Sequence, residues 1–351
     1  MKSNKIFIQI ASYRDNQLLF TIKDCIKNSH QPENLVFCIA WQHCVDDKWD
    51  SLDEYQHDNR FKIINIDYKD SEGVCWARHL IQQYYDNEEF TLQLDSHHRF
   101  IPNWDKELIT MIRNLQSAGY KKPLLTAYLP PFQPDKDPDE RQMYPCKLNF
   151  DKFTPEGVVF FLPAKIDNFE SLTSPIRCRF YSAHFCFTLG IFCKEVQHDP
   201  KLYFHGEEIS IAVRAFTWGY DLFSPHKIIA WHEYTRKYRT KHWDDAKDWF
   251  DLNAKSHIRL RKLFGIDAIE NNIDMDFGKY GFGPERSLSD YEKYAGICFK
   301  TRSVQQYTVD NESPPNPITE ADTFTKIFKY SIDVDLTDLP YNDYLFFGCN
   351  F

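Results

Sequence analysis

The first hundred residues alternate between strand patterns and helix patterns, and this alternation restricts the fold more than any other feature. Apolar strand-like runs occur at KIFIQIASY, NLVFCIAWQ, FKIINIDY and FTLQLD. Helical spacing of apolar residues follows the first run, in NQLLFTIKDCIKNS, and precedes the fourth, in GVCWARHLIQQYYDN. Strands separated by helices need crossover connections, which predicts an α/β fold with a mostly parallel sheet flanked by helices.

The pattern continues beyond the fourth strand and weakens toward the C-terminus. NWDKELITMIRNLQSAG predicts a helix and PLLTAYLP a strand, whereas residues 131–147 are rich in proline and charge, which predicts a surface loop that can move. GEEISIAVRAFTWG predicts a helix with an acidic first turn, and a second helical stretch covers residues 243–264. Residues 302–322 are polar and indicate a linker, and two strand-like runs follow it. We therefore predict a domain over 1–300 and a linker with a small β-rich segment over 301–351.

Composition and charge exclude several classes of protein. The net charge of −9 disfavours long-range attraction to nucleic acid or to an anionic membrane. The 10 cysteines form no C-x-x-C pair, which is typical of reduced thiols in a cytosolic protein. The N-terminal segment has no long apolar stretch or small-residue cleavage site, and no run reaches the length of a membrane span. We expect a cytoplasmic protein with no membrane span and no nucleic-acid partner.

The fourth strand ends in a group of polar and titratable residues, LDSHHRF. In open α/β sheets, ligands bind beyond the carboxyl ends of the strands. Asp95 and His97 are two residues apart in an extended segment, so both side chains can reach one point. A carboxylate and an imidazole suit Mn²⁺ or Mg²⁺ with phosphate oxygens as further ligands. The alternative is a helix-capping Asp95 beside ordinary surface histidines.

A second apolar run, IIAWHEYTRKYR, also ends in a histidine. His232 would complete a set of three protein ligands with Asp95 and His97, although a lone histidine is more often structural. Arg236, with Lys237 and Arg239 after it, offers cations for phosphate oxygens; the alternative is a solvated basic loop.

Two further motifs combine glycine with charged residues at a helix start. In DSEGVCWAR, Gly73 permits close approach of a ligand, and Arg78 one turn into the helix is placed to meet a diphosphate or a nucleobase. In FHGEEIS, Glu207 or Glu208 could contact a substrate hydroxyl or act as a base, although the helix dipole alone favours both. Dinucleotide, P-loop and serine-hydrolase signatures are absent from the sequence.

The ordered motifs resemble those of one enzyme family. IQIASYRD, CIAWQ, GVCWAR, LQLDSHHRF, SAHFCFTLG, DPKLYFHGEEISIAVRAFTWGYDLFSP and WHEYTR are similar to the GT-A glycosyltransferases of the polypeptide-hydroxyproline α-N-acetylglucosaminyltransferase family, over about residues 4–300. They resemble the polypeptide GalNAc-transferases more distantly. The resemblance implies a GT-A fold, a divalent cation, UDP-GlcNAc or a close relative as donor, retention of anomeric configuration, and a hydroxyl acceptor on a protein or glycan.

The resemblance also implies roles for individual residues. Asp95 and His97 match the D-x-D-like metal motif in a D-x-H form, and His232 matches the later metal-ligand histidine. The two glutamates match the motif facing the sugar and the acceptor. The residues matched to the nucleotide and diphosphate are Ser12, Tyr13, Arg14, Gly73 and Arg78, with Arg236 as a further cationic candidate.

Three alternative functions fit parts of this pattern: an inactive sugar-nucleotide-binding module, a UDP-sugar hydrolase, and a metal-dependent hydrolase or nuclease. The presence of all three candidate metal ligands and of the Gly-Glu-Glu motif favours an active transferase over an inactive module. The acidic net charge disfavours a nuclease.

Overall fold

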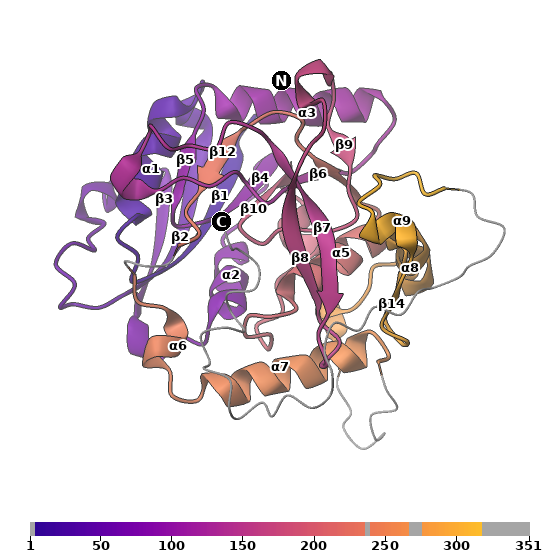
Figure 1. Ribbon diagram of the computed structural model, residues 1–351. Helices are drawn as coiled ribbons and strands as arrows, with labels where there is room; N and C mark the ends of the chain where they lie inside the picture. The colour runs from indigo at the N-terminus through magenta and orange to yellow at the C-terminus, as the bar shows by residue number, and fades with distance from the viewer. Residues whose placement is uncertain (1–3, 236–238, 267–275, 318–351) are drawn as a thin grey trace.

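The structure is a computed structural model that describes residues 4–235, 239–266 and 276–317 of the 351-residue chain. Within these ranges the largest sheet has eight strands, and helices pack on both of its faces (Figure 1), which confirms the predicted α/β class. In spatial order its strands are β3 (Phe61–Asp67), β2 (Leu35–His43), β1 (Ile6–Tyr13), β4 (Phe90–Asp95), β10 (Phe185–Leu189), β6 (Pro123–Thr126), β11 (Asp221–Ser224) and β9 (Ile176–Arg177).

The first four strands in the sequence pair in parallel, as predicted. Two helices, α1 (Leu18–Asn28) and α2 (Val74–Gln82), supply crossovers between these strands. Both faces of the central strand β1 are buried, which explains its nearly continuous apolar sequence. Ile8 packs in the core that includes α1, whereas Phe7 packs on the other face in a cluster that includes α2.

The other half of the sheet is mixed. β10 lies antiparallel between β4 and β6, β11 is parallel to β6, and β9 forms an antiparallel edge. The sheet is therefore mainly parallel, with antiparallel strands in its second half. The apolar runs of the sequence contain no information on strand direction, and a long connection allows either direction.

In the described part of the chain, three small two-stranded sheets accompany the main sheet. The most important for the site joins β5 (His98–Phe100) to β12 (Ala230–His232) in antiparallel pairing, with His232 directly opposite His98. The others are the hairpin of β7 (Cys146–Phe153) with β8 (Val159–Lys165), and the pair β13 (Ile297–Cys298) with β14 (Ser303–Val304).

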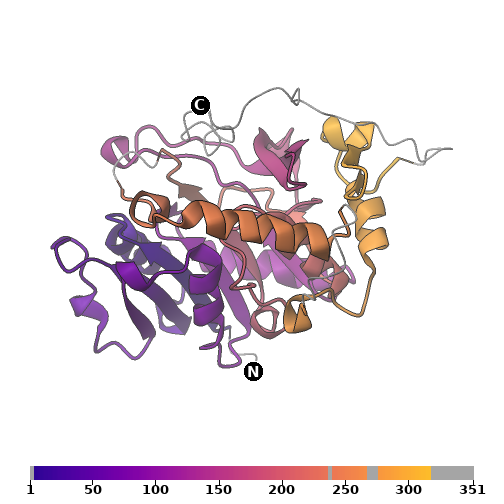
Figure 2. The same ribbon diagram turned by 90° about the horizontal axis from the view of Figure 1, so that it is seen from below.

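Long helices cover the sheet and the ends of its strands. Helix α3 lies along the top in Figure 1, and α7 crosses the bottom, where Figure 2 shows it facing the viewer. The predicted helical stretch over residues 243–264 is divided into α6 and α7, with a break between them. Among the described helices, none has both the length and the apolar character needed to cross a bilayer.

The α-helices that follow α2 are α3 (Trp104–Ser117), α4 (Phe192–Glu195), α5 (Glu207–Thr217), α6 (His242–Asp245), α7 (Trp249–Leu263), α8 (Leu288–Ala295) and α9 (Gln306–Val309) in the described part of the chain. Short 3₁₀ turns occupy η1 (Pro32–Asn34), η2 (Asp53–Tyr55), η3 (Tyr68–Asp70), η4 (Pro134–Lys136), η5 (Phe169–Ser171) and η6 (Gly278–Tyr280).

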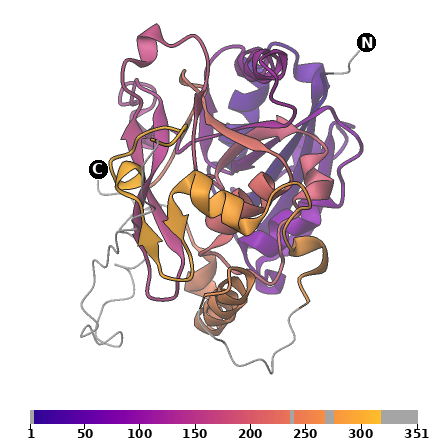
Figure 3. The same ribbon diagram turned by 90° about the vertical axis from the view of Figure 1, so that its right-hand side faces the viewer.

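The segment at residues 301–317, where a linker is predicted, contains β14 and α9. Figure 3 shows this segment beside the β7–β8 hairpin. Lys147 of β7 donates from Nζ to the carbonyl of Asn311 at 2.7 Å, and Arg179 donates from Nη2 to Oδ1 of Asn316 at 2.6 Å. The two strand-like runs predicted after residue 322 lie outside the described residues.

Candidate functional site: an Asp–His–His cluster beside a pocket

The fold brings the three predicted metal ligands together. Asp95 ends β4, His97 lies between β4 and β5, and the pairing of β5 with β12 places His232 beside them. One ligand atom from each residue lies within 4.8 Å of the others. The Oδ2 atom of Asp95 is 3.7 Å from Nε2 of His97 and 3.5 Å from Nε2 of His232. Residues more than 130 positions apart therefore converge on one point.

The donor chemistry of this cluster fits a divalent cation. Nε2 of His97 and both ring nitrogens of His232 are buried and have no hydrogen-bond partner within the described part of the chain. Burial and the neighbouring His184 hold the pKa of His232 well below its usual range, so its imidazole is neutral and offers a lone pair. Burial alone would raise the pKa of Asp95, but His232 and Arg78 outweigh it and keep this pKa well below its usual range. An ionised carboxylate and a neutral imidazole are the forms of these side chains that bind a metal.

Asp15, which the sequence prediction missed, holds His97 in place. Its buried Oδ2 lies 2.7 Å from Nδ1 of His97, accepts from Oγ of Ser96 at 2.7 Å, and accepts from Nη1 of Arg239 at 3.0 Å. Burial raises the pKa of Asp15, but His97 and Arg239 outweigh this and hold it below its usual range. A carboxylate on the far nitrogen of a metal-binding histidine fixes the ring and makes it a stronger ligand. Asp15 could have been identified from its position just after β1, which places it at the same edge of the sheet as Asp95.

Arg78 plays a comparable part for Asp95. Its Nη2 donates to Oδ1 of Asp95 at 2.6 Å, and its Nη1 donates to Oε2 of Glu207 at 2.5 Å. Only 3% of the Arg78 side chain is exposed. The sequence predicts that this cation meets a diphosphate or base, but its guanidinium is already shared by two carboxylates. In this structure Arg78 orients Asp95, which leaves Oδ2 directed toward the histidines.

The two predicted glutamates have different surroundings. Glu207 is buried and also lies 2.8 Å from Nδ1 of His198; burial raises its pKa, but Arg78 and His198 outweigh burial and lower it. Glu208 is only partly buried, and its carboxylate accepts from the Tyr128 hydroxyl at 2.7 Å and from the Ala183 amide at 2.8 Å. Burial raises the pKa of Glu208 to about 7. Glu208 is therefore the glutamate whose protonation can change near neutral pH.

A small cavity of about 130 Å³, here called the inner pocket, adjoins the cluster. The main-chain bend at Gly73, with φ of +104°, brings its Cα against Tyr203, so that a Cβ there would lie 2.9 Å from the tyrosine ring. The residues that line the inner pocket include Tyr13, Gln42, Gly73, Asp95, His97, Tyr203, Arg239 and His242.

The other nucleotide-binding candidates lie outside this lining. Ser12 is buried, and its carbonyl accepts from the side-chain amide of Gln42 at 3.0 Å. Arg14 is paired with Asp47 at 2.7 Å and with Asp245 at 2.9 Å. Arg236 lies outside the described residues.

Residues 239–243 cover the inner pocket, and the loop at residues 131–147 does not. Arg239 contacts His97 and Asp15. His242 lies between Tyr203, whose hydroxyl is 2.7 Å from its Nδ1, and the Ser71 carbonyl, 3.0 Å from its Nε2.

The loop at residues 131–147 packs against β12 instead. The Trp231 indole donates to the carbonyl of Gln142 at 2.8 Å, and the Arg141 guanidinium lies 4.4 Å from the Trp231 ring centre. The sequence predicts a surface loop that can move, and in this structure the loop is held against β12 by these contacts.

Comparisons with known proteins support an enzyme of this fold. The family model described as "Glycosyltransferase (GlcNAc)" matches residues 5–60 and 52–301. A comparison with curated proteins found no match. Among solved structures, GalNAc-T7 with UDP, GalNAc and Mn²⁺ is similar with a TM-score of 0.52 and 17% identity, over 74% of this chain and 48% of that chain. S. aureus TarS in complex with UDP-GlcNAc gives a TM-score of 0.43 and 12% identity, over 71% and 64% of the two chains.

The likeness to GalNAc-T7 confirms the predicted GT-A fold, and the chain spans about half the length of that protein. The family match covers most of the domain, including β4, β5 and β12, which build the Asp–His–His cluster. The chain therefore belongs to the GlcNAc glycosyltransferase family.

Proposed function

We propose that the protein is a metal-dependent glycosyltransferase that transfers GlcNAc from UDP-GlcNAc to a hydroxyl group of a protein or glycan. The observation that carries the proposal is the Asp–His–His cluster beside the inner pocket. Three of its four imidazole nitrogens are buried without a hydrogen-bond partner among the described residues. Following the resemblance described above, the proposal includes retention of anomeric configuration.

Asp95, His97 and His232 would hold Mn²⁺ or Mg²⁺, and the bound cation would supply Lewis-acid stabilisation of the departing UDP. The protein's own contribution is to preorganise these ligands. Arg78 fixes the carboxylate of Asp95, and Asp15 fixes the ring of His97. Ligands that are already oriented need no rearrangement as negative charge develops on the leaving group.

The donor requires more room than the inner pocket provides. Ligand pockets for molecules of this kind usually measure roughly 300–1,000 Å³, whereas the inner pocket measures about 130 Å³. We propose that residues 239–243 move outward when the donor binds. This movement separates Arg239 from Asp15, which frees a guanidinium to bind phosphate oxygens.

Glu208 is the proposed acceptor-binding residue. The residue is partly buried, and its carboxylate is positioned by Tyr128 and Ala183. Glu207, in contrast, is committed to Arg78 and His198. In its ionised form Glu208 can accept a hydrogen bond from an acceptor hydroxyl and orient it, which positions the nucleophile without full deprotonation.

A ligand screen with matched variants tests the proposal. We expect UDP-GlcNAc and UDP to raise the melting temperature only when Mn²⁺ is present, because a ligand stabilises the state that binds it. Asp95→Asn, which retains the size of the side chain, should lose this Mn²⁺-dependent shift while its circular dichroism stays native. Equal shifts with and without Mn²⁺, or an unchanged shift in Asp95→Asn, would contradict metal-dependent donor binding.

The products distinguish transfer from hydrolysis. In a screen of hydroxyl-bearing glycans and peptides, the proposal predicts a GlcNAc conjugate with an α-linkage, the same anomer as the donor, detectable by proton NMR. Release of UDP with free GlcNAc and no conjugate from any acceptor would favour the hydrolase alternative. A β-linked product would refute retention and leave transfer intact.

A further inference from the structure

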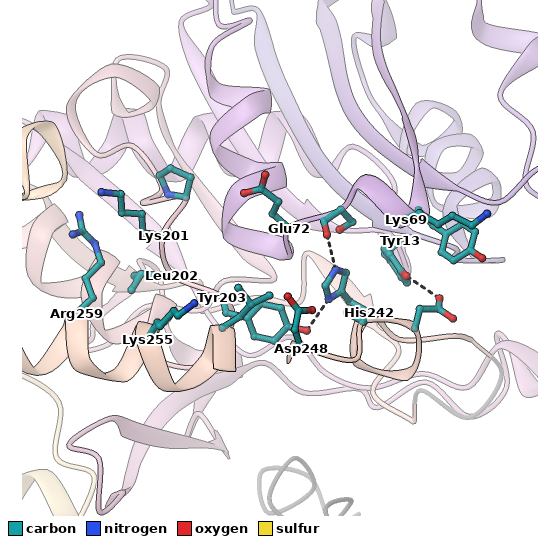
Figure 4. A pocket seen from close by; sticks show the side chains of 16 residues that line it. Tyr13, Lys69, Glu72, Lys201, Leu202, Tyr203, His242, Asp248, Lys255 and Arg259 are labelled. Atoms are coloured by element: carbon teal, nitrogen blue, oxygen red, sulfur yellow. Dashed lines mark hydrogen bonds between the residues drawn. The ribbon is translucent and has the colours of Figure 1, made fainter. Parts of the chain in front are cut away.

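A second and larger cavity of about 840 Å³, here called the outer pocket, adjoins the inner pocket (Figure 4). It lies between the segment from η3 to the start of α2 on one side and α7 on the other. The two pockets share Tyr13, Ser71, Tyr203 and His242 as wall residues. The hydrogen bonds of His242 to Tyr203 and Ser71 form the partition between them.

One end of the outer pocket is cationic. Figure 4 shows Lys201, Lys255 and Arg259 grouped there. Within the described ranges, neither lysine has an ion-pair partner, and both are exposed. Because the whole protein has a net charge of −9, a ligand anion would be attracted by this local group and not by the overall field.

Arg259 is a preorganised anion-binding group at this end. It is 5% exposed, its Nε donates to Oδ2 of Asp199 at 2.6 Å, and its guanidinium lies 4.6 Å from the ring centre of Phe277. The Asp199 and Phe277 contacts fix the plane of the guanidinium. For the two Nη atoms, no hydrogen-bond partner exists in the described part of the chain. A fixed guanidinium with unused donors suits a phosphate or carboxylate group.

The remainder of the outer pocket suits a sugar ring. Glu72 and Asp248 line its middle, where carboxylate oxygens can accept from hydroxyl groups. Tyr203 and Leu202 supply an aromatic and an aliphatic surface beside them. Pockets that combine apolar walls with a few polar groups are typical of small-molecule sites. The carboxylates in the middle also disfavour an anion there, which directs negative charge to the cationic end.

We infer that the outer pocket binds an anionic saccharide unit of the acceptor, with its phosphate or carboxylate at Arg259, Lys201 and Lys255. The inference rests on the proposed transferase function, because it assigns the acceptor to a cavity that adjoins the donor pocket. It further implies that the saccharide and the donor bind at the same time, in adjoining cavities.

The probes are glucose 6-phosphate, glucuronic acid and neutral glucose, titrated by ligand-observed NMR at constant ionic strength, first without UDP and then with saturating UDP and Mg²⁺. We expect at least one charged sugar to bind roughly tenfold more tightly than glucose. The two charged probes show whether a phosphate or a carboxylate is preferred. Charge reversal in Lys201→Glu/Lys255→Glu should remove this preference.

The matched control is Lys106→Glu/Lys121→Glu, which makes the same change in net charge at exposed lysines outside both pockets and should bind like the wild type. The inference would be overturned if charged and neutral sugars bound equally, or if Lys201→Glu/Lys255→Glu kept the preference for the charged sugar. It would also be overturned if the control variant lost this preference to the same extent, or if UDP displaced the probe. Binding of UDP with Mn²⁺, measured separately by the melting temperature in all variants, reports on the proposed function independently.

Discussion

Replacing Asp15 by asparagine tests whether the buried carboxylate behind the Asp–His–His cluster controls metal binding. Asp15 Oδ2 contacts His97 at 2.7 Å, Ser96 at 2.7 Å and Arg239 at 3.0 Å. Asparagine keeps the shape but replaces one accepting oxygen by an amide group and removes the charge. Loss of such a supporting partner typically reduces metal affinity roughly 10- to 100-fold, which corresponds to about 1.4–2.7 kcal/mol.

The assay is Mn²⁺ binding measured by electron paramagnetic resonance, which requires neither donor nor acceptor. We expect Asp15→Asn to raise the Kd for Mn²⁺ by roughly 10- to 100-fold. Asp50→Asn is the matched control, because Asp50 is also buried and accepts from the Trp41 indole at 2.7 Å but does not line the inner pocket. A natively folded Asp15→Asn protein with wild-type Mn²⁺ affinity would refute the role assigned to this carboxylate.

Two further predictions concern Glu208 and the start of α5. Because the pKa of Glu208 is raised to about 7 and the ionised form is the proposed hydrogen-bond acceptor, kcat/KM for the acceptor should increase as pH rises through this value. Glu208→Gln should lower kcat/KM and abolish that rise, and a variant with the wild-type pH profile would exclude Glu208. Gly206→Ala places a Cβ 1.9 Å from Leu260 at a φ of +91°, whereas Gly119→Ala has similar φ, +99°, and no atom within 4 Å. Urea unfolding should show that Gly206→Ala lowers the free energy of unfolding by roughly 2–5 kcal/mol, whereas Gly119→Ala lowers it by about 1–2 kcal/mol. Equal decreases would show that the Leu260 side chain can move away at little cost.

The Asp–His–His cluster could be predicted from the sequence because each of its residues follows an apolar strand. Asp95 and His97 lie at the end of β4, and His232 ends the run that forms β12. Parallel strands bring their carboxyl ends to one edge of the sheet, which is where Asp95 and His97 lie after β4. The direct pairing of β12 with β5 could not be predicted, since it depends on contacts between distant segments.

The contacts of the arginines could not be predicted from their sequence positions. A cation at a helix start is equally suited to a diphosphate or to a protein carboxylate. Arg78 binds protein carboxylates because Glu207, which lies 129 positions away in the sequence, provides the second one. For Arg14 it depends on Asp47 and Asp245. In both cases the deciding partner belongs to another element of the fold.

The direction of individual strands and the exact extent of the helices could not be predicted from local pattern. β10 is antiparallel to β4, and its apolar sequence is compatible with either direction. The helical stretch over residues 243–264 is interrupted because Ala246 leaves the helical conformation, with ψ of 106°. Residues 301–317 have the composition of a linker, yet their backbone hydrogen bonds and side chains engage the domain.

Anomalous diffraction from crystals grown with Mn²⁺ and UDP would locate the bound metal. We expect one strong manganese peak within coordinating distance of Asp95, His97 and His232, with UDP phosphate oxygens completing its coordination. We also expect Arg239 to have moved away from Asp15. A manganese peak elsewhere, or UDP bound at a distance from these three side chains, would contradict the proposed metal site.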